Sequence, residues 1–181
     1  GIKNVRVLDR TFNYNTRRAK ELLELFLEYH PDIRFHLEIH PALLSEELKE
    51  ELKHLPEGLL HLEAGIQSLR EPVLEKSRRM GKLTDALEGL KFLCSLPNME
   101  THADLIAGLP LYHLSEIFED IRVLAAYGAG EIQLESLKLL PGTEMRRRAE
   151  ELGIQYSPLP PYEVLQTREV NVSELQTARQ L

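Results

Sequence analysis

The segment His36-Leu37-Glu38-Ile39-His40 places a carboxylate between two imidazoles, which are side chains that bind metal ions. On a strand, His36 and His40 would lie about 13 Å apart at about 3.3 Å per residue. Both rings could not reach one zinc ion with bonds of about 2 Å. The segment also differs from the zinc-protease pattern, which is His-Glu-x-x-His on a helix. The spacing disfavours a metal held by this pair and leaves two interpretations: solvated or mutually hydrogen-bonded strand residues, or contact with a polar organic cofactor.

Polar residues recur at every second position in four strand-like segments. They are His36, Glu38 and His40; His61, Glu63 and Gln67; His102 and Asp104; and Gln133 and Glu135. Side chains alternate between the two faces of a strand, so each segment has one polar face. Burying one unpartnered polar group costs about 1–3 kcal/mol. The shared polar face must therefore be solvated or filled by a polar ligand.

Helical patterns alternate with these strands, at spacings typical of a βα unit. Expected strands are 5–8, 34–40, 59–67, 100–110 and 131–140, and expected helices are 16–30, 45–55, 84–96, 114–128 and 143–153. Suitable N-caps are Ser45, Thr84, Ser115 and Thr143, and Gly128 and Gly153 end helices. This order predicts an α/β fold with a parallel sheet, wound as a barrel or an open sheet. Ligands of such barrels bind at the C-terminal strand ends, which selects Glu38, His40, Gln67 and Asp104.

Composition limits the class of protein. The 181 residues are 43% apolar and 28% charged, and the net charge of −7 makes nucleic acid an improbable main partner. No apolar run approaches the roughly 18 residues of a membrane span, and a strand stands where a signal peptide would, so we expect a cytosolic protein without membrane contact. Cys94 is the sole cysteine, which excludes an internal disulfide and any cysteine-only metal site within this chain.

Two observations concern domain organisation. The chain starts with glycine and enters a strand at once, which suggests a segment of a longer protein. We expect residues 1–156 to form the barrel. The proline-rich stretch after Tyr156 then indicates that 157–181 begin a C-terminal appendage with a short helix-like end.

Further short motifs each have a structural and a functional interpretation. AGIQS (64–68) offers close backbone approach to a ligand or merely a turn, and DLIAGLP (104–110) places an unusual carboxylate in an apolar strand. Arg78 and Arg79 could bind a carboxylate or be solvated. LLPGTEM (139–145) could leave helix N–H groups for an anion, whereas most such turns are only turns. Cys94 and Arg146–Arg148 are interpreted as packing and surface residues.

Taken together and in order, these motifs resemble the radical S-adenosylmethionine superfamily. The matching stretches are LDRTFN, LEIHP, LEAGIQSL with a downstream SRRMG, HADLIAGLP and LKLLPGTEM, spread over residues 7 to 145. The resemblance is greatest to the group of this superfamily in which a cobalamin-binding domain precedes the barrel. Its members are often described by analogy with anaerobic Mg-protoporphyrin IX monomethyl ester oxidative cyclase. PPYEVLQT is also similar to the start of a C-terminal domain in one branch.

The resemblance implies a partial TIM barrel of (β/α)6 type that binds S-adenosylmethionine. It assigns Glu38 to the methionine amino group, Gln67 and Asp104 to the ribose hydroxyls, and Arg79, with Arg78 as the neighbouring possibility, to the methionine carboxylate. The family also needs a Cys-x-x-x-Cys-x-x-Cys loop for a [4Fe–4S] cluster, which this chain lacks. The resemblance therefore implies that the first strand and cluster loop lie upstream, that this chain alone is inactive, and that an unpaired edge at Val5 and Val7 favours self-association.

Three functions remain open. The first is radical S-adenosylmethionine chemistry on a small-molecule substrate, as oxidation or methyl transfer, with porphyrin cyclisation as one candidate. The second is a metal-dependent hydrolase barrel that uses the polar His and Glu residues. The third is a non-catalytic ligand-binding domain.

Overall fold

The computed structural model describes residues 1–180, so Leu181, the last residue of the expected appendage, lies outside the described residues. Within it the chain forms two compact units. Unit 1 comprises residues 1–66, 81–103 and 124–132, and unit 2 comprises 67–80, 104–123 and 133–181.

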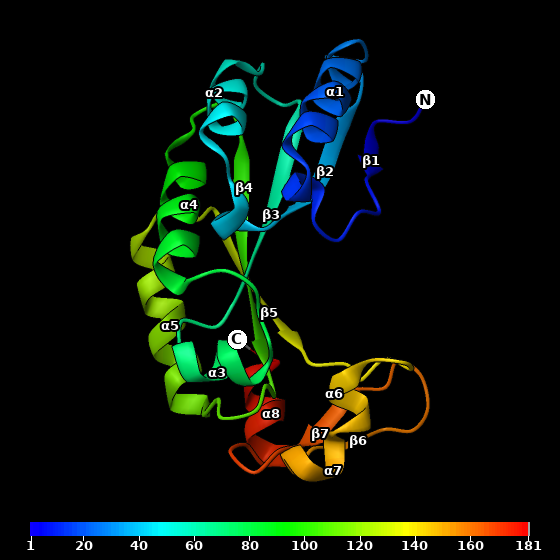
Figure 1. The fold of residues 1–181 in the computed structure, drawn as a ribbon, viewed down its shortest axis with the longest axis vertical. Helices are drawn as coiled ribbons and strands as arrows, with labels where there is room; N and C mark the ends of the chain where they lie inside the picture. The colour runs from blue at the N-terminus through cyan, green and yellow to red at the C-terminus, as the bar shows by residue number, and fades with distance from the viewer. Residues whose placement is uncertain (181) are drawn as a thin grey trace. The chain divides into compact units, whose positions relative to one another are not determined.

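The central element is a five-stranded sheet in the order β1-β2-β3-β4-β5 (Figure 1). Its strands are β1 (Asn4–Arg6), β2 (Arg34–Ile39), β3 (Leu60–Gln67), β4 (Glu100–Ala107) and β5 (Glu131–Ser136). The parallel register pairs Val5 with Phe35, and His36 with His61. Strand order follows chain order, as repeated βα units produce, and the fold is an α/β partial barrel of TIM type, as expected.

Helices follow the strands along the chain. They are α1 (Thr16–Leu27), α2 (Glu46–His54), α3 (Glu71–Lys76), α4 (Leu83–Ser95), α5 (Leu114–Ala126), α6 (Glu144–Arg147), α7 (Ala149–Leu152) and α8 (Val172–Ala178). Short 3₁₀ turns occur at η1 (Phe12–Tyr14) and η2 (Pro41–Leu43). An antiparallel pair, β6 (Gln155–Tyr156) and β7 (Val164–Gln166), precedes α8.

Unit 1 buries the apolar face of its strands. In β2 and β3 buried and half-exposed side chains alternate without a break, so Leu37 and Leu62 are fully buried while His36 and Glu63 are not. Helices α1 and α2 contact each other (Figure 1). Lys20 of α1 forms ion pairs with Glu47 and with Glu51 there.

Unit 2 has its own core around Tyr112, Ile117, Val164 and Leu175. Asp120 is buried at 1% exposure and binds polar groups of this unit. It accepts hydrogen bonds from Leu69 N–H at 2.8 Å, Arg70 Nε at 2.9 Å and Tyr112 Oη at 2.6 Å. The Ser68 hydroxyl donates to it as well, at 3.5 Å, so this carboxylate has a cation and three further donors.

The helix boundaries confirm some expectations and correct others. Ser45 and Thr143 are N-caps whose side chains accept backbone hydrogen bonds, and Gly153 ends α7 in the left-handed conformation. Thr84 is wrong as a cap because the chain turns at Gly81, with φ of 83°, and the helix already begins at Leu83.

Ser115 is also wrong as a cap, since α5 begins at Leu114. The N–H of His113 donates to the Glu116 side chain at 2.9 Å, the return contact of a capping box, which places the cap at His113. The single helix expected over 143–153 is divided at Arg148, because the backbone angles of this residue, φ −99° and ψ 11°, leave the helical region and end α6 there.

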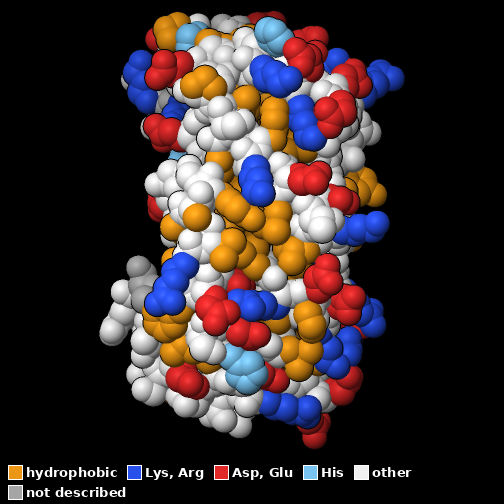
Figure 2. Space-filling model, turned by 90° about the vertical axis from the view of Figure 1, so that its left-hand side faces the viewer, with side chains coloured by type: hydrophobic (Ala, Val, Ile, Leu, Met, Phe, Trp, Pro, Cys, Tyr) orange, Lys and Arg blue, Asp and Glu red, His pale blue; other side chains and the backbone are white. Residues whose placement is uncertain are grey.

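The surface carries charges of both signs. Lysine and arginine side chains are interspersed with acidic ones on the face drawn in Figure 2. Among residues 1–180, no helix combines the length and the apolar character that a membrane span requires.

Candidate functional site

Residues expected to bind a cofactor occur in both units. Glu38 lies on β2 in unit 1, whereas Gln67, Arg79 and Asp104 belong to unit 2. Gln67 ends β3 with a positive φ of 75°, a conformation that costs energy for a residue with a side chain. Asp104 lies on β4 and is buried at 7% exposure. A buried carboxylate and a strained strand end are features that functional sites often have.

The two neighbouring arginines differ in their surroundings. Arg78 is 65% exposed on its side chain and is paired with Glu144. Arg79 is partly buried, and this burial lowers the pKa of its guanidinium. Arg79 is therefore better placed than Arg78 to bind an anion away from bulk water.

A cluster of three histidines and one acid lies on the polar face of unit 1. It consists of His36 on β2, His61 and Glu63 on β3, and His102 on β4. Ring centroids of His61 lie 4.8 Å from those of both His36 and His102. The strand register explains this proximity, because His36 and His61 are directly paired and neighbouring strands lie about 4.8 Å apart.

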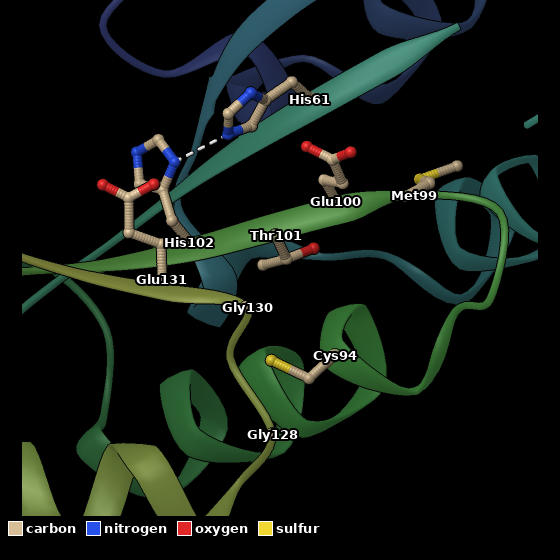
Figure 3. Close-up of a pocket in the computed structure, with 9 residues that line it drawn as sticks. All are labelled: His61, Cys94, Met99, Glu100, Thr101, His102, Gly128, Gly130 and Glu131. Carbon is tan, nitrogen blue, oxygen red and sulfur yellow. Dashed lines mark hydrogen bonds between the residues drawn. The ribbon is translucent and has the colours of Figure 1, made fainter. Parts of the chain in front are cut away.

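Hydrogen bonds and ion pairs connect the cluster. His36 Nε2 lies 2.7 Å from Glu63 Oε2, and His61 Nε2 lies 2.8 Å from His102 Nδ1 (Figure 3). His102 Nε2 lies 3.7 Å from the same Glu63 oxygen. Each histidine therefore has a polar neighbour on an adjacent strand.

Arg6 contributes a positive charge to this region. Its Nη2 donates to Glu63 Oε2 at 2.7 Å and to Glu38 Oε1 at 3.3 Å. The Arg6 side chain is 54% exposed, so solvent screens these contacts. Sequence analysis did not single out Arg6, because a lone arginine on an edge strand resembles any solvated surface residue.

Burial favours the neutral form of two histidines. It lowers the pKa of His61, and the charges of His102 and His36 lower it further. Burial also lowers the pKa of His102, against the opposing effect of Glu63. Neutral imidazoles are the form in which histidine accepts a proton or binds a metal ion.

A hollow of about 270 Å³ opens beside the cluster and is lined in part by His61, Cys94, His102 and Glu131 (Figure 3). Burial raises the pKa of the Cys94 thiol, so the protonated and less reactive form is favoured. A second hollow of about 340 Å³ is lined in part by Arg6, His36 and His61. His36, His61 and His102 thus border hollows large enough for small ions and molecules.

The backbone of His40 has a structural role. Its N–H donates to Asn13 Oδ1, and its carbonyl accepts from Asn13 Nδ2, each at 2.9 Å. These bonds hold the end of β2 against η1. The metal-capable group in residues 1–180 joins His36 to Glu63 and His102 and does not include His40, in agreement with the distance argument against the His36–His40 pair.

No protein-family model matches the chain, and no curated protein sequence matches it either. Solved structures do match. Two are of TsrM from Kitasatospora setae, a radical S-adenosylmethionine methyltransferase. The structure with cobalamin and a [4Fe–4S] cluster gives a TM-score of 0.68 at 20% identity, over 97% of this chain and 36% of that one. The structure with tryptophan and a S-adenosylmethionine analogue gives 0.66 at 18%, over 85% and 32%.

Two further proteins have the same fold. Elp3 from the archaeon Methanocaldococcus infernus gives a TM-score of 0.61 at 14% identity, over 83% of this chain and 40% of that one. HemN from Escherichia coli, coproporphyrinogen III oxidase and a radical S-adenosylmethionine enzyme, gives 0.58 at 17%, over 78% and 38%. This chain spans between 32% and 40% of the length of these proteins. At such identities the likeness establishes the fold, which is the partial (β/α) barrel that TsrM and HemN share.

Proposed function

We propose that this chain is the greater part of the catalytic barrel of a radical S-adenosylmethionine enzyme. One observation carries the proposal. The strands that bear the family-like motifs form the fold of TsrM, which is a methyltransferase of this kind, and of HemN, which is an oxidase of this kind. A motif order in the sequence and a fold in the structure are separate properties, and both favour the same superfamily.

Four side chains would bind S-adenosylmethionine. Asp104 and Gln67 accept hydrogen bonds from the ribose hydroxyls, for which a carboxylate and an amide are suitable acceptors. The turn after Gln67 is fixed, because Leu69 N–H donates to the buried Asp120 and Arg70 N–H donates to Ser68 Oγ at 3.1 Å. This support allows Gln67 to keep its unfavourable backbone conformation.

Arg79 would bind the methionine carboxylate and Glu38 the ammonium. A guanidinium and a carboxylate make pairs of this type with charge-assisted hydrogen bonds. Glu38 fits the role because its contact with Arg6 is long, at 3.3 Å, while Arg6 makes its short contact with Glu63. An incoming ammonium therefore competes with a weak, solvent-screened partner.

The remaining parts of the enzyme are proposed to lie outside these residues. A cysteine loop upstream of Gly1 would hold the [4Fe–4S] cluster, and a separate domain would bind cobalamin. When bound, the cluster and S-adenosylmethionine supply radical oxidation or methyl transfer on a small-molecule substrate. An oxidative cyclisation of a tetrapyrrole is one such reaction and is a hypothesis from the sequence resemblance.

Calorimetric titration with S-adenosylhomocysteine tests three of the four residues, namely Glu38, Asp104 and Arg79. The protein used contains this chain together with its cluster loop. Glu38→Gln, Asp104→Asn and Arg79→Gln should each weaken binding by about 10- to 100-fold, since a hydrogen bond to a charged group is worth about 1.5–3 kcal/mol. Unchanged affinity in all three variants would contradict the proposed site.

Two matched variants control this experiment. Arg78→Gln removes the adjacent guanidinium, which is already paired with Glu144, and should leave affinity unchanged. Glu88→Gln changes an exposed residue on α4 and should do the same. Loss of binding in Arg78→Gln with full binding in Arg79→Gln would reverse the assignment of the carboxylate partner.

We also propose two properties of the whole chain. Residues 157–181 would begin a C-terminal appendage to a barrel formed by 1–156. Strand β1, at one edge of the sheet, would allow self-association through its unpaired side.

A further inference from the structure

Three adjacent strands each place one metal-binding side chain on the same face of unit 1. His36 comes from β2, Glu63 from β3 and His102 from β4. The pattern is visible once the strands are aligned, because each carries a histidine followed two residues later by an acid: His36-Leu37-Glu38, His61-Leu62-Glu63 and His102-Ala103-Asp104. Cross-strand neighbours achieve the proximity that residues four apart within one strand cannot.

The donor atoms are spaced as a metal ion requires. Glu63 Oε2 lies 2.7 Å from His36 Nε2 and 3.7 Å from His102 Nε2, and all three donor atoms lie within 4.8 Å of one another. Donors around a tetrahedral zinc ion, with bonds of about 2.0–2.1 Å, are roughly 3.3 Å apart. The observed separations bracket this value, so small side-chain rotations would complete the site.

His61 orients one of the ligands. Its Nε2 is hydrogen-bonded to Nδ1 of His102 at 2.8 Å, which leaves Nε2 of His102 directed toward Glu63. Metal-binding histidines are commonly held in this way through their other ring nitrogen. The ligands are also well shielded from solvent, with side-chain exposures of 22% for His36, 15% for Glu63 and 2% for His102.

We propose that His36, Glu63 and His102 bind one divalent transition-metal ion, with a further coordination position open to water or substrate. Two imidazoles and one carboxylate suit zinc and the neighbouring first-row metals better than the hard ions Mg²⁺ and Ca²⁺. The hollow lined by His61, His102 and Glu131 borders one of the three ligands, His102 (Figure 3). The proposal shares no residue with the four assigned to S-adenosylmethionine and does not depend on that function.

The contact of Arg6 with Glu63 predicts how loss of Arg6 would change metal affinity. Its Nη2 bonds to the same Glu63 oxygen that a metal ion would use, at 2.7 Å, so the guanidinium and the ion compete. Because the Arg6 side chain is 54% exposed, it can swing into solvent when the ion binds. A cluster that served only as a hydrogen-bonded polar face would be weakened by loss of Arg6, whereas a metal site would bind its ion more tightly.

The test is calorimetric titration of the metal-free 181-residue chain with zinc chloride, and with cobalt chloride followed by visible absorption. We expect one ion per chain with a Kd below about 10 μM. His36→Gln and Glu63→Gln should each weaken binding by more than about 100-fold, since even residues behind a ligand change metal affinity by about 10- to 100-fold. Arg6→Gln should tighten binding by about tenfold or more, because it removes a positive charge next to the ion.

Two control variants keep the result interpretable. His54→Gln removes an exposed histidine outside the cluster, and Cys94→Ser removes the one thiol that lines the hollow; both should bind zinc as the wild type does. His36 is the more exposed histidine ligand, at 22% against 2% for His102, so His36→Gln is expected to disturb folding less than a change at His102 would. Absent zinc binding, binding that persists in both His36→Gln and Glu63→Gln, or weaker binding in Arg6→Gln would overturn the proposal.

Discussion

Asp120 and Tyr112 form a buried polar pair in the core of unit 2. Tyr112 is fully buried and donates its hydroxyl to Asp120, which also accepts from Arg70. Burial and the nearby carboxylate raise the pKa of Tyr112 above its usual value. The phenol therefore stays protonated in the folded chain at pH values where an exposed tyrosine ionises.

Tyr112→Phe should destabilise the fold by about 1.5–3 kcal/mol at neutral pH, because a hydrogen bond to a buried charged group is lost. Urea unfolding followed by circular dichroism measures this change. A free energy of unfolding equal to that of the wild type would show that the hydroxyl contributes nothing.

The same residue predicts a dependence on alkaline pH. Its folded-state pKa is raised, so its contribution is complete below the unfolded pKa of about 10 and is lost as pH rises further toward the folded value. Above about pH 10 the wild type should lose up to about 1.4 kcal/mol per pH unit from this group, and Tyr112→Phe should lack that component. Parallel slopes in the two proteins would contradict the assignment.

Residue patterns predicted part of the candidate site. The alternation of His36, His61 and His102 with apolar neighbours correctly indicated one polar strand face. Which of these side chains meet depends on strand register, and register follows from loop geometry and packing that the sequence does not show directly. For this reason the grouping of His36 with Glu63 and His102, and the contact of Arg6 with Glu63, emerged only in the structure.

At the scale of elements, the close approach of α4 to η2 constrains the sequence. A Cβ atom built on Gly89 would lie 2.2 Å from the carbonyl oxygen of Pro41 and 2.8 Å from its carbon. Both are backbone atoms, which cannot rotate away as a side chain can. The glycine is therefore required by the packing, although glycine in a helix interior costs about 1 kcal/mol relative to alanine.

Gly89→Ala should destabilise the fold by about 1–3 kcal/mol or more despite the better helix propensity of alanine. Thermal unfolding measures the effect, with Glu88→Ala on the exposed neighbouring position as the control, expected within about 0.5 kcal/mol of the wild type. A Gly89→Ala protein as stable as Glu88→Ala would show that α4 moves away from η2 without cost.

The prediction of helices and strands was correct where a repeating pattern of apolar residues was long enough to recognise. Helices α1, α2 and α4 and strands β2, β3 and β4 match the expected segments, because amphipathic or alternating patterns extend over six residues or more in each. Helix α3 and the β6–β7 pair were missed. Their six, two and three residues are too few to establish a period, and tertiary packing decides their conformation.

At the scale of the whole molecule, the proposed self-association would use the edge strand β1. Lys3 O and Val7 N are bonded to β2, so by the alternation of a strand the N–H groups of Asn4 and Arg6 face away from it. Outward-facing backbone groups at a sheet edge can pair with another chain.

Asn4→Pro should reduce the proposed self-association, because proline removes one outward N–H without breaking the bonds to β2. Sedimentation velocity over a range of protein concentrations measures it. Asn4→Ala, which keeps the N–H, should associate as the wild type does. Equal association of all three proteins would place the contact elsewhere.

The Arg6–Glu63 ion pair has a consequence for the order of assembly. Small zinc domains need their metal in order to fold, because the free energy of metal binding supplies their free energy of folding. Here the Arg6 guanidinium already pairs with the Glu63 carboxylate, so the strands could assemble without a metal and the proposed ion would bind afterwards. A chelator should accordingly remove the proposed metal without unfolding the protein. A sample to which the metal is then added back should have the same fold as one that never lost it.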